Sequence, residues 1–496
     1  MMGALKNHRD EQVMVSVEDL VPANHFLRTI EATIDFSFIE EKLLPYYCED
    51  NGRPSIHPIT LFKMMFIGYF YGVRSERQLA KEIQTNVAYR WFLGLSLTDA
   101  VPHHSTISFN RRTRFLDTTI FEDIFDEIVR QAIEHRMVGG RALMTDSTHI
   151  KANANKHKYE KQPKKSRRQA YMEELEAAVN EDRLENGKKN SPRKEGVALQ
   201  KQTRISTTDP DSGFMMRDGK PDGFHYLDHR TVDVKHNIIT DTCITAGNVA
   251  DSVPYLDRLD IQIKKFRFSV EAVALDAGYF TSHICKRLSE KGIFMVMGYR
   301  RFGSSNKDVP KRLFHYVQEK DVFACPMGCI LSYATTSRTG DRTYKSNPSD
   351  CAVCPMRDGC FSASQKQRVV TRHIWERFKE QARLNKRTKA GKQLYRMRCT
   401  TIERSFADAK ELNGYRYARY RGLKSVQMQA YLTAACQNMK KIAHYLTKTG
   451  QVMGDFYGKR RFICEMFTCF TIKNEKSLRL TRTLQVSRQS EKKGFL

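Results

Sequence analysis

The sequence predicts an α/β protein preceded by a helical region, and three observations lead to this prediction. Residues 20 to about 135 repeat apolar side chains at helical spacing, as Phe26, Ile30 and Ile34 do. From Arg141 onward, strand-like apolar runs alternate with amphipathic helical segments, which is the pattern of an α/β layer. The chain of 496 residues is too long for one typical core and long enough for two or three domains.

The helical region contains one strongly apolar helix and two helices with recognisable starts. The segment LFKMMFIGYFYG is short and contains Lys63, so we expect a buried helix and not a membrane span. Ser75 is a candidate N-cap for the next helix, and Ser105 for a later one that brings Arg111 and Arg112 together. Short helices in this order are typical either of a helix-turn-helix unit that contacts DNA or of an ordinary bundle with solvated arginines.

The α/β region begins with the strand ALMTDSTHIKA and is then interrupted by a polar segment. That segment runs from Lys156 to about Gly213, and its blocks of charge predict an exposed insertion, either a solvated linker or an arm that contacts DNA. The runs FHYLDHRTVDV and IITDTCIT follow as a hairpin joined at 235–237. A helix in ADSVPYLDRLDIQIKKF, the strand SVEAVALD, a helix in SHICKRLSEKG and the strand IFMVMGYR complete the pattern.

The charge of the chain points to a polyanionic partner. Lysine and arginine number 83 against 56 acidic residues, which gives a net charge of +27. This surplus suits DNA, although RNA or ribosomes would explain it equally well. The N-terminus is too polar for a signal peptide, so we expect an intracellular, soluble protein whose 12 cysteines are thiols or metal ligands.

Three carboxylates occupy positions that suit a metal-dependent nuclease. Asp146 and Asp276 each end a strand-like run, in LMTDSTHIKANA and EAVALDAGYF, and Glu403 opens an amphipathic helix in TTIERSFADAK. Carboxylates from different elements can hold two Mg²⁺ ions about 3.5–4 Å apart, which activate the nucleophile and stabilise the leaving oxygen of a phosphodiester. Singly, each residue is also typical of a turn, a cap or a solvated helix position, so the prediction depends on all three together.

A cysteine-rich segment lies between residues 301 and about 380. Its five cysteines are Cys325, Cys329, Cys351, Cys354 and Cys360. Four thiolates at such spacings suit structural Zn²⁺, and we favour all of them except Cys329, which is left spare. Free thiols in a small β insertion and redox chemistry are the alternatives.

A basic stretch follows the helix that Glu403 opens. GYRYARYRGLKS carries Arg416, Arg419, Arg421 and Lys424, at a spacing that can contact several phosphates without reading their sequence. A solvated basic face would show the same spacing. The basic tail at 451–496 contains no motif that we can interpret.

These motifs resemble those of the bacterial insertion-sequence DDE transposases, in the branch with a cysteine-bearing insertion before the catalytic glutamate. DSTHIKANANK resembles the first aspartate motif of that family, ALDAGYF the second, and IERSFADAKELNGYRYARYRGL the glutamate motif, with ACQNMKKIAHYL as the helix that follows. The resemblance implies a DNA-binding helical domain at 1–135 and an RNase H-like catalytic core at 136–300 and 381–450. It places a charged insertion at about 156–213 and a small cysteine-rich insertion at 301–380.

The resemblance also implies roles for single residues. Asp146, Asp276 and Glu403 would be catalytic ligands of Mg²⁺ or Mn²⁺, and Lys410 would face the DNA backbone or the scissile phosphate. Arg398 fits an arginine of the family signature, although four residues separate it from Glu403 where the signature has three. We group Arg398 with the DNA-binding residues, together with Arg111, Arg112, Arg416, Arg419 and Arg421. His149, three residues after Asp146, is expected to support the site and not to react itself.

The activity implied by the resemblance is Mg²⁺-dependent cleavage and strand transfer of double-stranded DNA. The chain would bind the terminal inverted repeats of its element and a target DNA, act as a homodimer, and work on the nucleoid in the bacterial cytoplasm. The alternatives are an inactive, transposase-derived DNA-binding regulator and an RNase H-like nuclease. A tyrosine recombinase is disfavoured, because Tyr417 and Tyr420 lack the spaced arginine and histidine partners of that mechanism.

Overall fold

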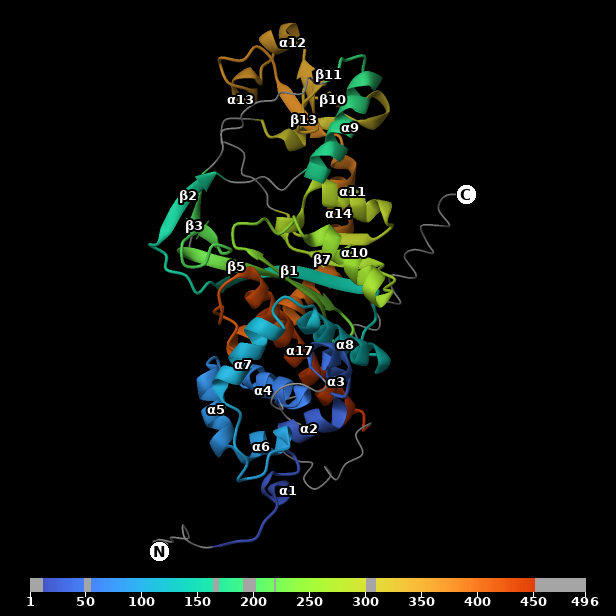
Figure 1. Ribbon diagram of the computed structural model, residues 1–496. Coiled ribbons are helices and arrows are strands. Elements are labelled where there is room, and N and C mark those ends of the chain that lie inside the picture. The colour runs from blue at the N-terminus through green and yellow to red at the C-terminus, as the bar shows by residue number, and fades with distance from the viewer. Residues whose placement is uncertain are drawn as a thin grey trace, which may run out of the picture.

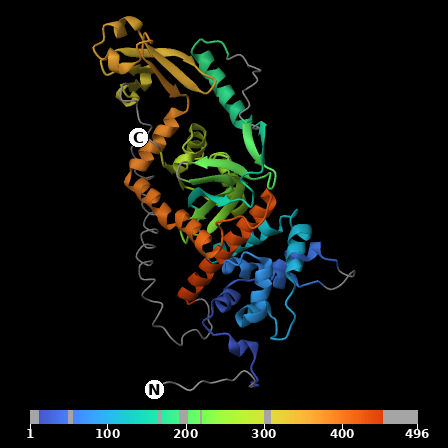
Figure 2. The same cartoon turned by 90° about the vertical axis from the view of Figure 1, so that its left-hand side faces the viewer.

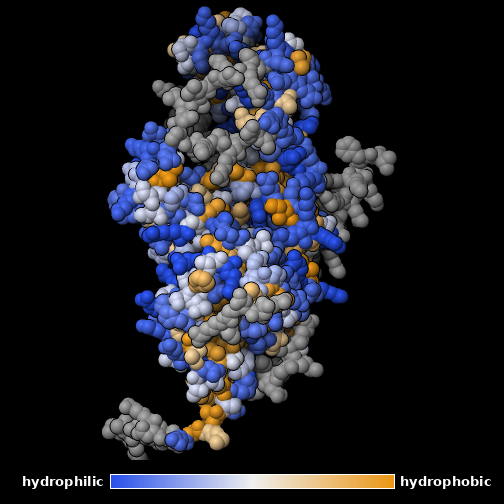
Figure 3. Space-filling model, in the orientation of Figure 1, coloured by the Kyte–Doolittle hydropathy of each residue, from blue (hydrophilic) through white to orange (hydrophobic). Residues whose placement is uncertain are grey.

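The computed structural model describes residues 12–48, 55–163, 169–190, 202–217, 220–299 and 309–450. Figure 1 shows three layers along one axis, with the N-terminal helices at one end, a central sheet, and a second, smaller sheet at the other end. The face seen in Figure 3 is mainly hydrophilic, as expected for a chain with 28% charged residues. None of the helices described is long and apolar enough to cross a membrane.

The N-terminal region is helical, as predicted. Its α-helices are α1 (Val17–Leu20), α2 (Phe26–Thr33), α3 (Phe38–Leu43), α4 (Pro58–Phe70), α5 (Glu76–Thr85), α6 (Val87–Leu93), α7 (His104–Phe109) and α8 (Ile120–Glu134). The apolar helix α4 is buried, and its Lys63 forms an ion pair with Glu31 at 2.6 Å. Ser75 caps α5, as predicted, by accepting from the Gln78 amide. The expected cap at Ser105 is wrong by two residues, because His103 caps α7 and accepts from the Ser105 amide.

The central sheet contains β4 (Gly213–Arg217), β5 (Lys220–Asp233), β6 (Ile239–Ala246), β1 (Ala142–Lys151), β7 (Ala272–Leu275) and β8 (Phe294–Met297). β5 is antiparallel to both β1 and β6, whereas β7 is parallel to β1 and β8 is parallel to β7. The order β6-β5-β1-β7-β8 with these directions is an RNase H-like core. The predicted hairpin is present, and Asn237 takes a left-handed backbone (φ 60°) in its turn.

The two faces of the sheet are covered by different helices. One face packs against α10 (Tyr255–Phe266), α11 (Ser282–Glu290) and α14 (Glu376–Arg387), through residues such as Leu143, Val273 and Met295. The other face, which carries Met144 and Ala274, packs against α8 and α17 (Leu423–Lys448). Because side chains alternate along a strand, residues two apart share a face, and this alternation decides which way the candidate catalytic residues point.

The last described helix, α17, joins the helical region to the sheet. Its apolar residues Met428, Leu432 and Met439 belong to the same buried cluster as α2, α4 and α8. Its polar side chains also pair with the outer edge of β6: Asn438 exchanges two hydrogen bonds with the backbone of Ile239, at 2.7 and 2.8 Å. The core of the helical region therefore continues into α17 and one face of the sheet.

The two predicted insertions pack against each other. The charged insertion contains β2 (Tyr159–Pro163), α9 (Gln169–Glu185) and β3 (Gln202–Ser206), and the cysteine-rich insertion contains β9 (His315–Val317), β10 (Val322–Ala324), β11 (Ile330–Thr336), β12 (Asp341–Ser346), β13 (Val369–His373), α12 (Pro348–Ala352) and α13 (Arg357–Cys360). Asp182 of α9 accepts from Arg342 and Thr336, and Leu175 and Val179 pack with Trp375. The prediction of an exposed charged insertion therefore holds for most of α9, but its residues Leu175, Val179 and Asp182 are buried where α9 lies beside the cysteine-rich sheet (Figure 1).

Candidate active site

Asp146 and Asp276 lie at the same edge of the sheet and point to the same face. The parallel register pairs Ala142 with Ala272 and Thr145 with Leu275, so the two aspartates follow residues that are directly paired. Ala142 and Ala274 lie on the face of the sheet that packs on α8 and α17. Asp146 is four residues after Ala142 and Asp276 is two residues after Ala274, so both aspartates point to that face. The prediction that each aspartate ends a strand holds for Asp276, which follows β7, but is wrong for Asp146, which lies inside β1; parallel pairing of β1 with β7 makes the two residues neighbours.

Glu403 reaches this edge from the first turn of α16 (Ile402–Leu412). Ile402, Phe406 and Ala409 bury one side of α16, whereas Glu403 remains exposed. Its carboxylate lies close enough to Cys399 to be the main cause that raises the pKa of that thiol. It also belongs to the group of anions that act on Arg398. Thr401 donates to Met144 Sδ at 2.7 Å and Lys410 donates to Thr148 Oγ1 at 2.5 Å, so α16 runs along β1 past Asp146.

Arg398 occupies the space between the two aspartates. It lies on a 3₁₀ turn (Met397–Thr400) after α15 (Lys389–Arg396). Its Nη2 donates to Asp146 Oδ2 at 2.5 Å, and its Nη1 lies 3.6 Å from Asp276 Oδ1. Burial opposes the charge on Arg398, but Asp146, Asp276 and the neighbouring Tyr395 outweigh it and raise the pKa of the guanidinium. The prediction that Arg398 contacts DNA does not match this placement, because the side chain is only 4% exposed.

The carboxyl group of Asp146 is strongly perturbed by its surroundings. Burial is the main cause that raises its pKa to about 6, and the charges of Asp276 and Asp251 act in the same direction. Arg398 and the Ser147 amide, which donates to Asp146 Oδ1 at 2.8 Å, act in the opposite direction. Buried carboxylates of this kind are common where a site is arranged for chemistry.

Asp251 is a further acidic residue at this edge, and the sequence reasoning missed it. It lies between β6 and α10 and accepts from Ser147 Oγ at 2.7 Å. Gly278 makes room for it, because a Cβ on that glycine would lie 2.8 Å from Asp251 Oδ2. The sequence contains only a weak indication of Asp251. Because β6 runs in the same direction as β1, an acidic residue shortly after the end of β6 lies at the same edge of the sheet.

A buried arginine fixes α16 against the sheet. Arg230 of β5 forms an ion pair with Asp228 at 2.8 Å, and both side chains are fully buried. Its Nη1 donates to Ser405 Oγ at 3.0 Å and to Gln437 Oε1 at 2.8 Å. These bonds tie β5 to α16 and α17 and so position Glu403 over the sheet edge. The sequence reasoning did not single out Arg230.

Lys410 lies on the same face as Asp146, two turns along α16 from Glu403. Its Nζ donates to Thr148 Oγ1 at 2.5 Å, and Thr148 lies two residues after Asp146 on β1. A cation in this position suits the negative charge of a phosphate near the carboxylates. His149 lies on the opposite face of β1, in ring contact with His225.

Metal ligation is not preformed at either predicted centre. In the part of the chain that the structure describes, no group of three or more histidine, cysteine, aspartate or glutamate side chains is arranged to hold a metal ion. At the sheet edge the donors are carboxylate oxygens, which suit Mg²⁺, but the guanidinium of Arg398 lies between two of them. A metal ion held by Asp146 and Asp276 therefore requires Arg398 to move.

The cysteine-rich sheet brings its thiols into one neighbourhood. Burial and then Cys325 raise the pKa of Cys329, and burial raises the pKa of Cys360, with Cys351 and Cys354 among the contributing neighbours. Cys329, which we expected to be spare, is therefore a near neighbour of Cys325. All five thiols are free.

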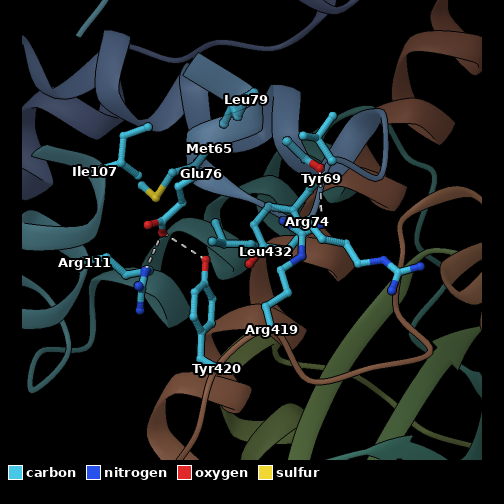
Figure 4. Close-up of a pocket in the computed structure, with 12 residues that line it drawn as sticks. Met65, Tyr69, Arg74, Glu76, Leu79, Ile107, Arg111, Arg419, Tyr420 and Leu432 are labelled. Atoms are coloured by element: carbon cyan, nitrogen blue, oxygen red, sulfur yellow. Dashed lines mark hydrogen bonds and ion pairs between the residues drawn. The ribbon is translucent and has the colours of Figure 1, made fainter. Parts of the chain in front are cut away.

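Two of the arginines expected to contact DNA are bound inside the protein (Figure 4). Arg111 pairs with Glu76 at 2.9 Å and lies 3.7 Å from the ring centre of Tyr420, which itself donates to Glu76 at 3.1 Å. Arg419 lies 4.0 Å from the ring centre of Tyr69. The cavity between these residues, about 20 Å³, has room for about one water molecule. These side chains join the helical region to the loop after α16 and are not available to DNA.

The other predicted DNA contacts remain at the surface. Arg112 is exposed, and Arg416 is exposed beside Glu411, with which it forms an ion pair. Arg421 donates to the backbone of Asn153 at 2.9 Å. Lys424 is exposed and pairs with Asp117 at 2.6 Å. Exposed cations of this kind can exchange a weak surface pair for a phosphate.

Comparison with known proteins identifies two transposase domains. The family described as "Transposase domain (DUF772)" matches residues 15–113, in the helical region. The family described as "Transposase DDE domain" matches residues 324–443, which include the cysteine-rich sheet, α16 and most of α17. A cryo-EM structure of the piggyBac transposase synaptic complex with hairpin DNA is similar at a TM-score of 0.35 and 10% identity, over 87% of this chain and 78% of that chain. No curated protein matches the sequence.

Proposed function

We propose that the chain is a DDE-type transposase, which cleaves the ends of a DNA element and joins them to a target, and the two transposase family matches support this proposal. The observation that carries this proposal is that Asp146 and Asp276 lie on either side of Arg398 at one end of the sheet, while α16, which carries Glu403, runs along β1 past Asp146. We assign these three residues as the catalytic carboxylates and as the ligands of Mg²⁺ or Mn²⁺. Bound divalent metal would activate the attacking hydroxyl or water and stabilise the leaving oxygen.

The remaining side chains of the edge would hold the DNA in place. Lys410 would neutralise a phosphate next to the carboxylates, since it lies on the same face as Asp146. Arg398 would have to leave Asp146 and Asp276 when these two aspartates bind metal. Ser147 and Asp251 would hold the backbone at Asp146 through their hydrogen bond. The exposed arginines Arg112, Arg416 and Arg421 would contact the DNA backbone.

We further propose the setting of this reaction. The DNA partners are the terminal inverted repeats of a bacterial insertion sequence and a double-stranded target. Two ends must be held at once, so the active complex would contain at least two copies of the chain. The reaction would take place in the bacterial cytoplasm, on the nucleoid. The net charge of +27 supports a polyanionic partner.

The test is a cleavage assay on supercoiled DNA that carries the ends of the element, with Mg²⁺ or with EDTA. Wild-type protein should cut at the ends in Mg²⁺ only, and Glu403→Gln should bind the DNA without cutting it. Glu411→Gln is the matched control, because Glu411 is an exposed acid on the same helix, away from the aspartates.

Three outcomes would contradict the proposal or part of it. Cutting by Glu403→Gln at the wild-type rate would remove Glu403 from the catalytic site. Binding without cutting by the wild-type protein, in Mg²⁺ and also in Mn²⁺, would favour the inactive regulator. Cutting without transfer of the new 3′ end into a second duplex would favour a simple nuclease.

A further inference from the structure

A recess of about 430 Å³ opens beside the candidate catalytic carboxylates. Its lining residues are Tyr299, Lys386, Arg387 and Lys392. Tyr299 follows the end of β8, and the register of β8 with β7 pairs Met297 with Leu275, the residue before Asp276. Since the strand order is β1-β7-β8, Tyr299 lies one strand further from Asp146 than Asp276 does. The recess therefore continues the line of catalytic residues along the sheet edge.

The recess combines a cation with two aromatic rings. The Lys386 ammonium lies 3.9 Å from the ring centre of Tyr395 and 5.3 Å from that of Tyr299. Burial and the charge of Arg398 lower the pKa of Lys386, while Tyr299 and Asp276 act against them. The Arg398 guanidinium lies 5.4 Å from the centre of the same Tyr395 ring and 3.6 Å from Asp276 Oδ1, so the recess lies next to the carboxylates.

In the described part of the chain, no carboxylate forms an ion pair with the cations of the recess. Among the residues described, Lys386, Arg387 and Lys392 form no ion pair, whereas Lys379 and Arg383, earlier on α14, both pair with Glu376. The last turn of α14 and the first of α15 thus present positive charge to the recess (orange helices in Figure 2). Cations left unpaired around a hollow favour an anionic ligand.

We propose that this recess holds an unpaired nucleotide of the DNA strand that passes the carboxylates, with its base against Tyr299 and its phosphates beside Lys386, Arg387 and Lys392. The inference rests on the proposed function, since that function brings DNA to this edge. A cationic groove with aromatic platforms is the arrangement that binds single-stranded nucleic acid. The volume of about 430 Å³ suits a small ligand such as one nucleotide.

The test measures binding of the full chain to a 30-base-pair duplex with a short single-stranded DNA tail, in EDTA so that no cleavage occurs. Lys386→Gln should remove one phosphate contact and reduce the slope of log K against log salt by about 0.7. Tyr299→Leu should weaken binding of the tailed duplex about fivefold or more through lost stacking, with the blunt duplex unaffected. Lys291→Gln is the matched control, because Lys291 lies before β8, at the opposite end of that strand, and pairs with Asp260.

Photochemical crosslinking distinguishes this site from other basic surfaces of the protein. With 5-iododeoxyuridine at each tail position in turn, irradiation should attach one position to Tyr299, and peptide mass spectrometry would identify the residue. Equal unfolding temperatures of the variants and the wild type would show that each variant is folded.

Several results would overturn the inference. They are the absence of a crosslink at Tyr299, a salt slope for Lys386→Gln equal to that of Lys291→Gln, and tighter binding of an RNA tail than of a DNA tail. If these appear while Mg²⁺-dependent cleavage persists, the recess assignment fails alone. If the wild type crosslinks at Tyr299 but never cleaves, the proposed function fails and the recess assignment stands.

Discussion

The ion pair between Arg398 and Asp146 gives the sharpest quantitative test of the site. Their hydrogen bond is 2.5 Å long, and the two side chains are 4% and 19% exposed. Opposite charges about 4 Å apart interact by about 4 kcal/mol at an effective dielectric constant of 20. Desolvation of the two groups offsets part of that attraction. We therefore expect a coupling free energy of roughly 2–3 kcal/mol at pH 8, obtained from this balance.

The assay is a double-mutant cycle. The free energy of unfolding by urea would be measured in EDTA for the wild type, Arg398→Gln, Asp146→Asn and the double variant. The coupling needs ionised Asp146, whose pKa is raised to about 6, so it should be present at pH 8 and largely lost at pH 5. The folded wild-type protein binds the proton of Asp146 more tightly than the unfolded chain does. This carboxyl group therefore lowers the free energy of unfolding as the pH rises from about 4 to about 6.

An exposed ion pair on the next helix is the control for this cycle. Arg404 and Asp408 pair at 2.8 Å, with side chains 60% and 30% exposed. Exposed pairs at this helical spacing contribute about 0.3–0.5 kcal/mol. A coupling between Arg398 and Asp146 no larger than the control, or one equal at pH 5 and pH 8, would refute the reasoning that a buried guanidinium neutralises the site.

Three further predictions concern other parts of the molecule. Glu76→Ala should lower the free energy of unfolding by about 3–5 kcal/mol, because it leaves the buried Arg111 without its carboxylate; urea unfolding checks this, and a loss below 1 kcal/mol would contradict it. Asp182→Asn should weaken the docking of α9 by about 1–3 kcal/mol, seen as faster amide hydrogen exchange in α9 with β1 unchanged. Purified protein should carry about one Zn²⁺ per chain by elemental analysis, and Cys351→Ser should lose it; a metal-free wild type would reject the zinc prediction.

Much of the fold followed from local pattern, because strands and helices carry their periodicity in the sequence. The hairpin at 235–237, the buried helix α4 and the strand before Asp276 were all predicted from runs of a few residues. The adjacency of Asp146 and Asp276 was predicted only as neighbouring strands of one sheet; the register that places both on one face belongs to the structure.

The sequence did not predict the interactions whose two residues lie far apart along the chain. Arg111 looked like a free cation because Glu76 is 35 residues earlier and on another helix. Arg398 was assigned to DNA because its aspartate partner is 252 residues away. Asp251 belongs to no recognisable motif, and only the direction of β6 brings it to the edge. Long-range pairing of charges is set by tertiary packing, which a local pattern does not contain.

The position of α17 has a consequence for how the protein is made. The helices α2, α4 and α8 leave the ribosome early, but α17, which completes their buried cluster, begins only at Leu423. At about 5–20 residues per second, the stretch from Glu134 to Leu423 takes roughly 15–60 s to synthesise. Throughout that interval the apolar faces of the first helices lack their final cover, so the nascent chain must either bind a chaperone there or delay the packing of its first third until its last described helix appears.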